Sequence, residues 1–171
     1  MSVSVFDMIT MQHLWSTPET RAIFGESNRL QKWLDFEVAL AKTQAALGII
    51  PASAAEAIAA TGKIENLDVE AIAAEVRRIK HTLMPVLKEW QRHLPKDAAE
   101  YLHYGATTQD VVDTGVVLQL KETHAIVKRD LAVIGRELLR LAKEHRDTLM
   151  VGRTHGVQAL PITFGHKCAI W

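Results

Sequence analysis

The stretch DVVDTGVVLQLKETHAIVKRDLAVIGRELLRLAKEHR, residues 110–146, decides the fold of this chain. It contains no proline and only two glycines, Gly115 and Gly135, and its apolar residues share one slowly drifting helical face. A helix of roughly 35 residues would be about 50 Å long, which exceeds the diameter of a compact domain of this size. Its many β-branched residues do not stabilise an isolated helix, so other long helices must pack against it. The sequence therefore predicts an all-α protein organised around one long helix.

Residues 1–109 have the pattern of several shorter helices. Apolar side chains recur at helical spacing over residues 30–45, with Ser27 or Asn28 as the expected N-cap. An alanine-rich helix is expected at residues 52–61. This part of the chain is therefore predicted to be an N-terminal helical domain.

Pro85 interrupts the next helical pattern. Because proline cannot donate a hydrogen bond to the preceding turn, we expect a break at residues 81–84 and a new helix over residues 85–93. His81 is therefore expected at a helix end or in the connection between two helices.

The last segment, residues 161–171, begins with a proline suited to the first turn of a helix. It has no C-terminal glycine and ends on the apolar run AIW, which is unusual for a natural terminus. We therefore expect these 171 residues to be the N-terminal portion of a longer chain. The predicted domains are a helical domain at 1–109 and the truncated start of a long-helix bundle at 110–171.

Composition excludes several classes of partner. Twenty Lys and Arg balance twenty Asp and Glu, so no net charge favours nucleic acid or an anionic membrane. No window of 18 residues lacks a charged side chain, and the N-terminus has no cationic region, so neither a membrane span nor a secretory signal is indicated. A cytoplasmic location is expected. The single cysteine, Cys168, cannot form an internal disulfide and is interpreted as a small buried apolar residue.

The stretch GRTHGVQALP, residues 152–161, places one imidazole among small and polar neighbours. His155 lies between Thr154 and Gly156, where both a side chain and bare backbone can approach a ligand closely. This arrangement indicates a binding loop, although a loop histidine bonded to backbone is the structural alternative.

The stretch GATTQD, residues 105–110, precedes the long helix. The hydroxyls of Thr107 and Thr108 come just before Asp110, which is a good N-cap for that helix. Free hydroxyls and backbone amides would converge there, and a helix N-terminus favours an anion. Together with the 152–161 stretch it indicates part of an active site for a carboxylate-bearing substrate, although both threonines could serve only as capping residues.

These two stretches, extended to GATTQDVVDT (105–114) and GRTHGVQALPITFGHK (152–167), resemble two signature regions of the fumarase/aspartase superfamily, and its adenylosuccinate lyase branch in particular. The opening of the chain, with FD, WLDFE and GIIP, is more similar to the 3-carboxy-cis,cis-muconate cycloisomerase branch. Two long motifs in this order and spacing are a specific signal. Nothing here matches a third signature that resembles SSxMPxKxNP.

The resemblance implies β-elimination, in which a base removes a proton beside a carboxylate and an acid protonates the leaving nitrogen as fumarate forms. Histidine suits the acid because its usual pKa, about 6.5, lies near the working pH. The roles that the resemblance implies are His155 as the acid, Thr154, Thr107 and Thr108 on substrate carboxylates, Gln158 as a polar contact, and His81 as a second active-site histidine. The base is a serine of the missing third signature, and neither a cofactor nor a metal is implied. Of the other histidines, His103 has the most relevant context because it adjoins the 105–110 stretch.

The resemblance further implies a small dicarboxylate or succinyl substrate and a homo-oligomer, with a tetramer expected. Because a helix of about 50 Å lies between the two motifs, each active site is predicted to take one motif from each of two subunits. The 171 residues alone are therefore expected to be inactive.

Three functions remain open from the sequence. An adenylosuccinate-like C–N lyase ranks first, yet VFD at residues 5–7 replaces the Arg-Tyr pair that usually binds the nucleotide phosphate. A muconate cycloisomerase or another fumarate lyase ranks second, because cycloisomerases commonly lack a histidine where His155 stands. A lyase acting on another N-substituted aspartate fits both departures. The third possibility is a non-catalytic helical oligomerisation module.

Overall fold

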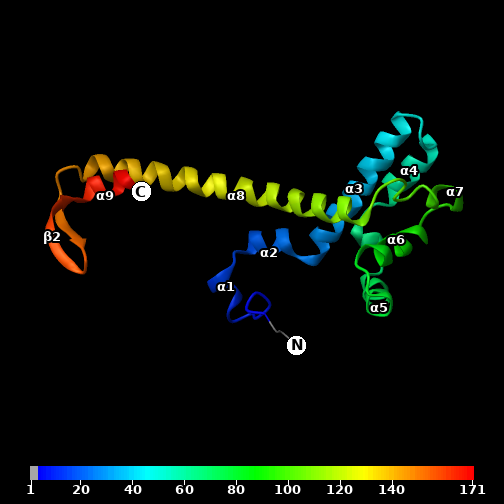
Figure 1. The fold of residues 1–171 in the computed structure, drawn as a ribbon, viewed down its shortest axis with the longest axis horizontal. Coiled ribbons are helices and arrows are strands. Elements are labelled where there is room, and N and C mark those ends of the chain that lie inside the picture. The colour runs from blue at the N-terminus through cyan, green and yellow to red at the C-terminus, as the bar shows by residue number, and fades with distance from the viewer. Residues whose placement is uncertain (1–3) are drawn as a thin grey trace. The chain divides into compact units, whose positions relative to one another are not determined.

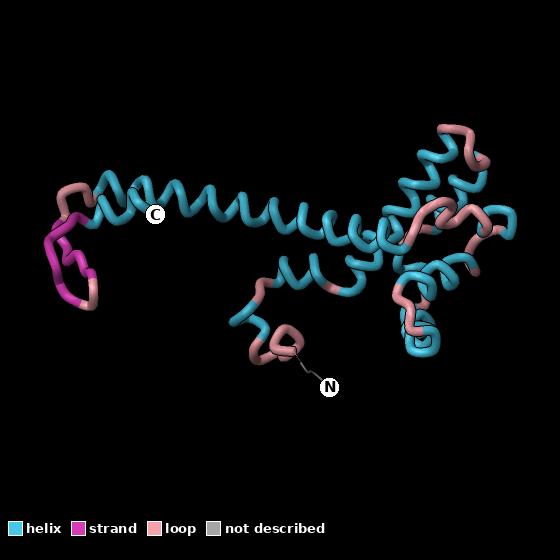
Figure 2. Tube along the Cα trace, in the orientation of Figure 1, coloured by secondary structure: helices cyan, strands magenta, loops and turns pink. Residues whose placement is uncertain are grey.

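The computed structural model describes residues 4–171 of the chain. These residues form two compact units, one that extends to Thr123 and one that runs from His124 to Trp171. Helices make up most of the described chain, and its only strands form one hairpin (Figure 2). The predicted all-α class is therefore confirmed, with a small two-stranded addition that the sequence did not predict.

The first unit contains short helices and the beginning of one long helix (Figure 1). Their bounds are α1 (Gln12–Trp15), α2 (Pro18–Phe24), α3 (Glu26–Ala46), α4 (Ala52–Thr61), the 3-10 turn η1 (Ile64–Asn66), α5 (Val69–Ile79), α6 (Leu83–Gln91), α7 (Lys96–Ala99) and α8 (Thr108–Glu144). The helix expected at residues 52–61 is confirmed as α4.

The core of the first unit forms around α3. Leu30, Trp33 and Leu34 of this helix are buried together with apolar residues of α4 and α6. Trp90 of α6 is fully buried, and its indole N–H donates a 2.8 Å hydrogen bond to the hydroxyl of Thr61. A buried indole that satisfies its one donor in this way fixes the relative position of the two helices.

The predicted helix over residues 30–45 is confirmed, but its predicted cap is wrong. Gly25 is both the C-cap of α2 and the N-cap of α3, so Ser27 and Asn28 lie inside the first turn. The amide of Asn28 instead donates to the carbonyl of Ile23 at 2.9 Å, which satisfies an orphan carbonyl at the end of α2. The kink at Gly25 therefore joins two helices where the sequence suggested a capping residue.

Helix α6 begins at Leu83, two residues before the position predicted from Pro85. The break is confirmed and comprises residues 80–82, in which Lys80 has a left-handed φ of 56°. Pro85 occupies the first turn of α6, where no intrahelical hydrogen bond needs its missing N–H.

The long helix is confirmed as α8, which has 37 residues and begins and ends two residues earlier than predicted. Its first turns belong to the core, because Val111 is buried and Gln119 donates a 2.6 Å hydrogen bond to the carbonyl of Ile23. The two units meet within this helix, and the predicted domain boundary at residue 109 stays a prediction. Neither α8 nor any other helix of the described residues has the length and apolar character needed to cross a membrane.

Gly115 is the position of closest approach between α8 and α3. A Cβ atom there would lie 2.7 Å from Cδ1 and 2.9 Å from Nε1 of the buried Trp33. Gly115→Ala should therefore lower the free energy of unfolding by about 1–3 kcal/mol, because the added methyl group would overlap the buried indole of Trp33 and force it to shift. Urea denaturation followed by tryptophan fluorescence would measure this change.

Gly135→Ala is the matched control in the same helix. A Cβ atom at Gly135 would meet nothing within 4 Å, so this substitution should stabilise α8 by about 0.5–1 kcal/mol through helix propensity. Equal effects of the two substitutions would contradict the close packing of Gly115 against Trp33.

The second unit ends in an antiparallel hairpin of β1 (Leu149–Thr154) and β2 (Val157–Thr163), followed by α9 (Phe164–Ile170). The expected helix at residues 161–171 is therefore partly wrong, since Pro161 lies in β2 and the helix begins three residues later. The side chain of Thr163 caps α9 by accepting from the backbone N–H of His166 at 3.2 Å.

Helix α9 packs closely on the end of α8. The backbone N–H of Gly165 donates to the carbonyl of His145 at 2.9 Å, and a Cβ atom at Gly165 would lie 2.6 Å from the carbonyl oxygen of Ala142. Cys168 of α9 is 2% exposed, which confirms its interpretation as a buried residue.

Candidate active site

The two threonines of the 105–110 stretch lie where the chain enters α8. Thr107 immediately precedes the helix, and the carboxylate of Asp110 accepts a 2.9 Å hydrogen bond from its backbone N–H. The prediction of Asp110 as the N-cap is therefore wrong, because Thr107 occupies that position, but Asp110 does help to cap α8 from within its first turn. Within residues 4–171 no side chain pairs with the hydroxyls of Thr107 or Thr108, so both can bind a ligand at the positive end of the helix.

His103, the histidine next to this stretch, pairs with a buried carboxylate. Its Nδ1 lies 2.6 Å from Oε1 of Glu37 on α3, and the side chain of Glu37 is 1% exposed. Burial raises the pKa of the Glu37 carboxyl, because desolvation penalises the charged form more than His103 stabilises it. His103 has a left-handed φ of 64°, a conformation that few residues other than glycine adopt.

A second side chain of α3 holds the same segment. The amide of Gln44 donates a 2.7 Å hydrogen bond to the carbonyl of Tyr104. Gly105 follows with a φ of 73°, which glycine adopts without strain. Glu37 and Gln44 are seven residues apart and therefore lie on the same face of α3, two turns from each other.

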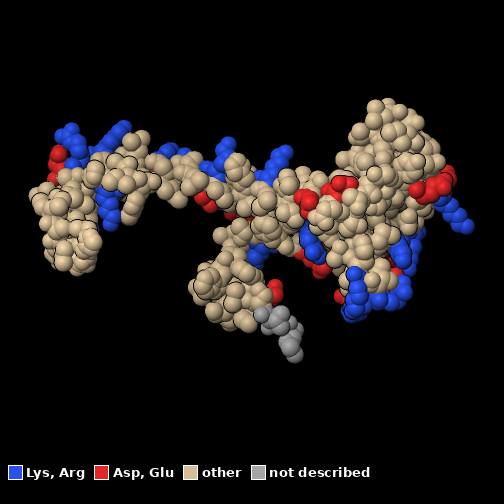
Figure 3. Space-filling view, in the orientation of Figure 1, with Lys and Arg blue, Asp and Glu red and all other residues tan. Residues whose placement is uncertain are grey.

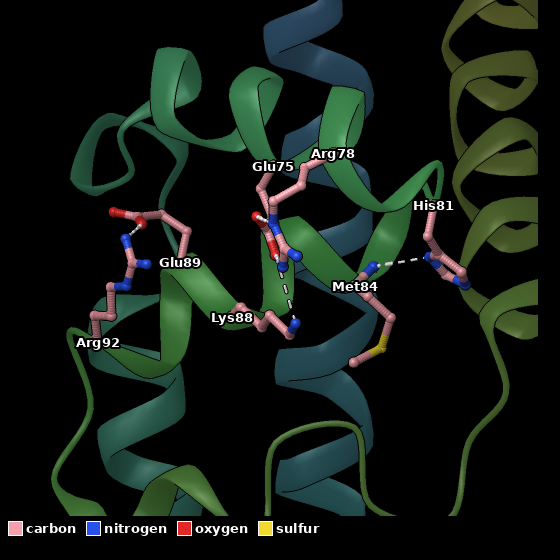
Figure 4. A network of polar contacts seen from close by, with 7 residues as sticks. All are labelled: Glu75, Arg78, His81, Met84, Lys88, Glu89 and Arg92. Carbon is pink, nitrogen blue, oxygen red and sulfur yellow. Dashed lines mark hydrogen bonds and ion pairs between the residues drawn. The ribbon is translucent and has the colours of Figure 1, made fainter.

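His81 lies in the break between α5 and α6, as predicted. Its Nδ1 accepts a 3.1 Å hydrogen bond from the backbone N–H of Met84, one of the orphan donors at the start of α6 (Figure 4). A nitrogen that accepts carries no proton, so the imidazole in this arrangement is neutral with its proton on Nε2. His81 can therefore present a defined N–H donor, and its catalytic role stays a prediction.

The ion pairs near His81 have a different character. Glu75 accepts from Nε of Arg78 at 2.7 Å and lies 3.6 Å from Nζ of Lys88, and Figure 4 shows His81 apart from this group. Arg78 is the main reason that the pKa of Glu75 falls to about 2. Because Arg78 and Lys88 are exposed and Glu75 is partly exposed, these residues of α5 and α6 are interpreted as a solvated ion-pair network outside the site.

His155 lies at the tip of the hairpin in the second unit. His155 and Gly156 both have positive φ, 49° and 72°, and Thr154 pairs directly with Val157, so the turn is of the two-residue I′ type. The imidazole is exposed. The hairpin therefore presents His155 outward in one defined backbone conformation.

Thr154 and Gln158 flank this tip and are both exposed. Gln158 pairs with Arg153 across the hairpin, one position before Thr154, so the register places Thr154 and Gln158 on opposite faces. Arg153 is the only charged residue of the two strands, and Figure 3 shows a hairpin surface with little charge. A positioned imidazole on a hairpin whose strands carry one charged side chain, Arg153, is suited to proton transfer.

Known proteins are similar to this chain over most or all of its length. A family model described as lyase matches residues 13–171. The N-acetyl-S-(2-succino)cysteine lyase of Dickeya dadantii is 48% identical over 171 residues, which are 100% of this chain and 37% of that protein. The adenylosuccinate lyase of Methanothermobacter thermautotrophicus is 42% identical over 157 residues, or 92% of this chain and 35% of that protein. This chain belongs to the lyase family of the fumarase/aspartase superfamily.

A solved structure agrees with this assignment. The β-carboxy-cis,cis-muconate cycloisomerase of Acinetobacter calcoaceticus matches with a TM-score of 0.88 and 36% identity, over 93% of this chain and 38% of that protein. This member of the lyase family therefore spans well under half the length of the relatives it matches.

In this lyase-family chain the predicted site residues fall into two groups, each within its own unit. Thr107, Thr108 and His81 lie in the first unit, and Thr154, His155 and Gln158 lie in the second. Among residues 4–171, no cluster of His, Cys, Asp and Glu side chains is arranged to hold a metal ion. The sequence did not identify Glu37 as a site residue. The helical pattern around it predicted α3, but nothing in the sequence indicated that its partner is His103, 66 residues away.

Proposed function

We propose that this chain is the N-terminal part of a lyase that eliminates a leaving group from a succinyl-type substrate and releases fumarate. The main support is identity of 48% over the whole chain with an N-acetyl-S-(2-succino)cysteine lyase. On this basis an S-succinylated thiol is the preferred substrate. The base, expected to be a serine of the third signature, is not among these residues.

The residues of this chain have distinct roles in the proposed reaction. Thr107 and Thr108 bind a substrate carboxylate at the start of α8, where backbone N–H groups and the helix dipole favour negative charge. Thr154 binds a carboxylate beside His155, and Gln158 supplies a polar contact. His155 gives a proton to the leaving atom, and the Nε2–H of His81 donates to substrate.

The leaving atom decides how much the acid contributes. A thiol has a pKa of about 8.5, so sulfur can leave as thiolate with little help from an acid. An amine leaving group is far too basic to depart as an anion and must be protonated. The same His155 would therefore be helpful in a C–S lyase and essential in a C–N lyase.

Adenylosuccinate cleavage is the second candidate, supported by 42% identity over 157 residues with an adenylosuccinate lyase. Two observations rank it lower. The identity is lower than the 48% with the N-acetyl-S-(2-succino)cysteine lyase, and the chain has Val5, Phe6 and Asp7 where adenylosuccinate lyases usually have an Arg-Tyr pair for the phosphate.

We further propose a homo-oligomer in which subunits share active sites, with a tetramer expected. Beyond its first turns, α8 exposes a series of large apolar side chains, which are Val116, Val117, Leu120, Val127, Leu131, Val133, Ile134 and Leu139. An apolar surface of this extent is typical of an interface. A straight helix of 37 residues is about 55 Å long, which supports sites that combine Thr107 and Thr108 of one subunit with His155 of another.

The proposed function predicts fumarate release by the complete lyase that carries these residues. Three substrates would be compared at equal concentration. Ultraviolet absorbance would follow fumarate release from N-acetyl-S-(2-succino)cysteine and from adenylosuccinate. The third substrate, 3-carboxy-cis,cis-muconate, would be assayed for lactone formation. We expect the highest kcat/KM on the thioether and no turnover by residues 1–171 alone. Faster turnover of adenylosuccinate would make the second candidate correct, and lactone formation without fumarate would contradict both.

A further inference from the structure

Glu37 is a buried acidic group that no step of the proposed reaction uses. It lies in the middle of α3, is 1% exposed and has a single side-chain partner, His103. Its other oxygen, Oε2, has no hydrogen-bond partner among the described residues. Because a buried carboxyl without full hydrogen bonding is destabilising, its one contact must provide a compensating benefit.

That contact is made to a strained segment. His103 has a φ of 64°, and Gly105 two residues later has a φ of 73°. Glycine adopts such a conformation freely, whereas a histidine adopts it only where its surroundings hold it. The 2.6 Å contact with Glu37 is the only side-chain hydrogen bond of His103 in the described chain, so Glu37 is the group that stabilises this backbone conformation.

The segment from His103 to Thr107 is short and fixed at both ends. At its beginning, Glu37 and Gln44 of α3 hold His103 and Tyr104. At its end, α8 begins at Thr108 and packs on α3 through Gly115 and Trp33. Only residues 105–107 connect the two fixed points, so the backbone direction at His103 determines where the hydroxyls of the threonines lie.

We propose that Glu37 is a positioning residue that acts through His103 to hold the carboxylate-binding threonines, Thr107 and Thr108, in place. The proposal rests on the function proposed above for these two threonines. It predicts that loss of the Glu37–His103 hydrogen bond displaces the 105–108 segment while the core of the first unit remains folded. Substrate affinity should then fall more than the rate of the chemical step.

Two pairs of substitutions separate this role from general stability. Glu37→Ala and His103→Ala each remove the hydrogen bond. Glu37→Gln retains an acceptor for His103, and His103→Asn retains both a donor and tolerance of positive φ. The conservative member of each pair should therefore rescue what the alanine variant loses.

Glu89→Ala is the matched control. Glu89 is also a buried glutamate of the first unit, and its carboxylate lies 3.4 Å from Nε2 of His93 and is paired with Arg92. Figure 4 shows Glu89 and Arg92 together, and within residues 4–171 the ion pairs and hydrogen bonds found for the Glu89 side chain join it to Arg92 and His93, not to the 103–108 segment. Its removal should change stability without moving the threonines.

The first measurement uses the amide groups of residues 105–108 in the chain, by two-dimensional NMR and hydrogen exchange. We expect shifted amide signals across residues 105–108 in both alanine variants and exchange about tenfold faster or more at Thr107, whose N–H donates to Asp110, with values near the wild type in Glu37→Gln and His103→Asn. Unchanged 105–108 amides in a folded Glu37→Ala chain would overturn the proposal. Equal changes in Glu89→Ala would also overturn it. If Glu37→Ala does not fold, the comparison of His103→Ala with His103→Asn decides in the same way.

The second measurement uses the complete lyase. Glu37→Ala should raise KM about tenfold, the scale of one lost positioning contact, with a smaller change in kcat, and Glu37→Gln should restore it. A fall in kcat at unchanged KM would contradict a role through the threonines. If the wild-type protein releases no fumarate, the proposed function fails, and the amide measurements still test whether Glu37 positions this segment.

Discussion

In the complete lyase, His155→Ala should lower kcat for an amine-leaving succinyl substrate by about 10²-fold or more, while substrate affinity changes less. The expected loss is large because His155 is exposed at the hairpin tip and is the only imidazole within the two strands and their turn. No neighbouring group of the hairpin can donate the proton in its place. Initial rates of fumarate release over a range of substrate concentrations would separate kcat from KM.

The same substitution should have a smaller effect on a thioether substrate. Since thiolate is a good leaving group, a loss of about tenfold is expected for N-acetyl-S-(2-succino)cysteine. The ratio of the two losses therefore reports whether His155 acts on the leaving atom. Equal losses on both substrates would indicate a role in binding, and an unchanged kcat on both would remove His155 from the mechanism.

His166→Ala is a suitable control for these measurements. His166 is another exposed histidine of the second unit, and only its backbone N–H contributes to the cap of α9. It should leave kcat near the wild-type value. Replacing Thr107 or Thr108 with valine should raise KM before it lowers kcat, because the carboxylate that we propose they bind is present in both the ground state and the transition state.

Local signals in the sequence were sufficient for most of the helices. The 3.6-residue period identified α3 and α8, and the predicted break before α6 followed from the chemistry of Pro85. The bounds were less accurate because caps depend on neighbours. Gly25 acts as a cap since α2 and α3 meet there, which no single helical pattern indicates.

The hairpin was missed for a physical reason. His155-Gly156 is a weaker turn signal than Asn-Gly, and both strands are exposed within the chain, so they lack the alternation of apolar and polar residues that marks a half-buried sheet. The motif was expected to form a loop, which is correct only for His155 and Gly156, since its other residues belong to β1 and β2. What the sequence could not give is the register that separates Thr154 from Gln158.

Glu37 shows the limit of reading a site from motifs. A glutamate in a helical pattern is normally a surface residue, and only the approach of His103 from a distant segment makes it part of the candidate site. The residues that touch substrate can be inferred from a resemblance. The residues that position them depend on contacts between segments far apart in sequence.

Mixing two defective lyases should restore activity if subunits share active sites. One chain carries His155→Ala and the other carries Thr107→Val with Thr108→Val, so each lacks one of the two groups of site residues. In hybrid oligomers, a site that takes its threonines from one subunit and its histidine from another will sometimes have both groups intact. Random association of equal amounts gives about a quarter of such sites, so kcat/KM should recover to about a quarter of the wild-type value.

A site built from one chain would give the opposite result, because every chain in the mixture carries one defect. The exchange of subunits must therefore be verified, by mass spectrometry of chains labelled with ¹⁵N, before and after incubation. A mixture assayed before exchange should have only the average activity of its two components. No recovery after complete exchange would contradict shared sites and would require the two ends of α8 to serve different substrates or to be joined by another part of the protein. Recovery would explain why the first signature region leads into a continuous helix of 37 residues before the second region begins.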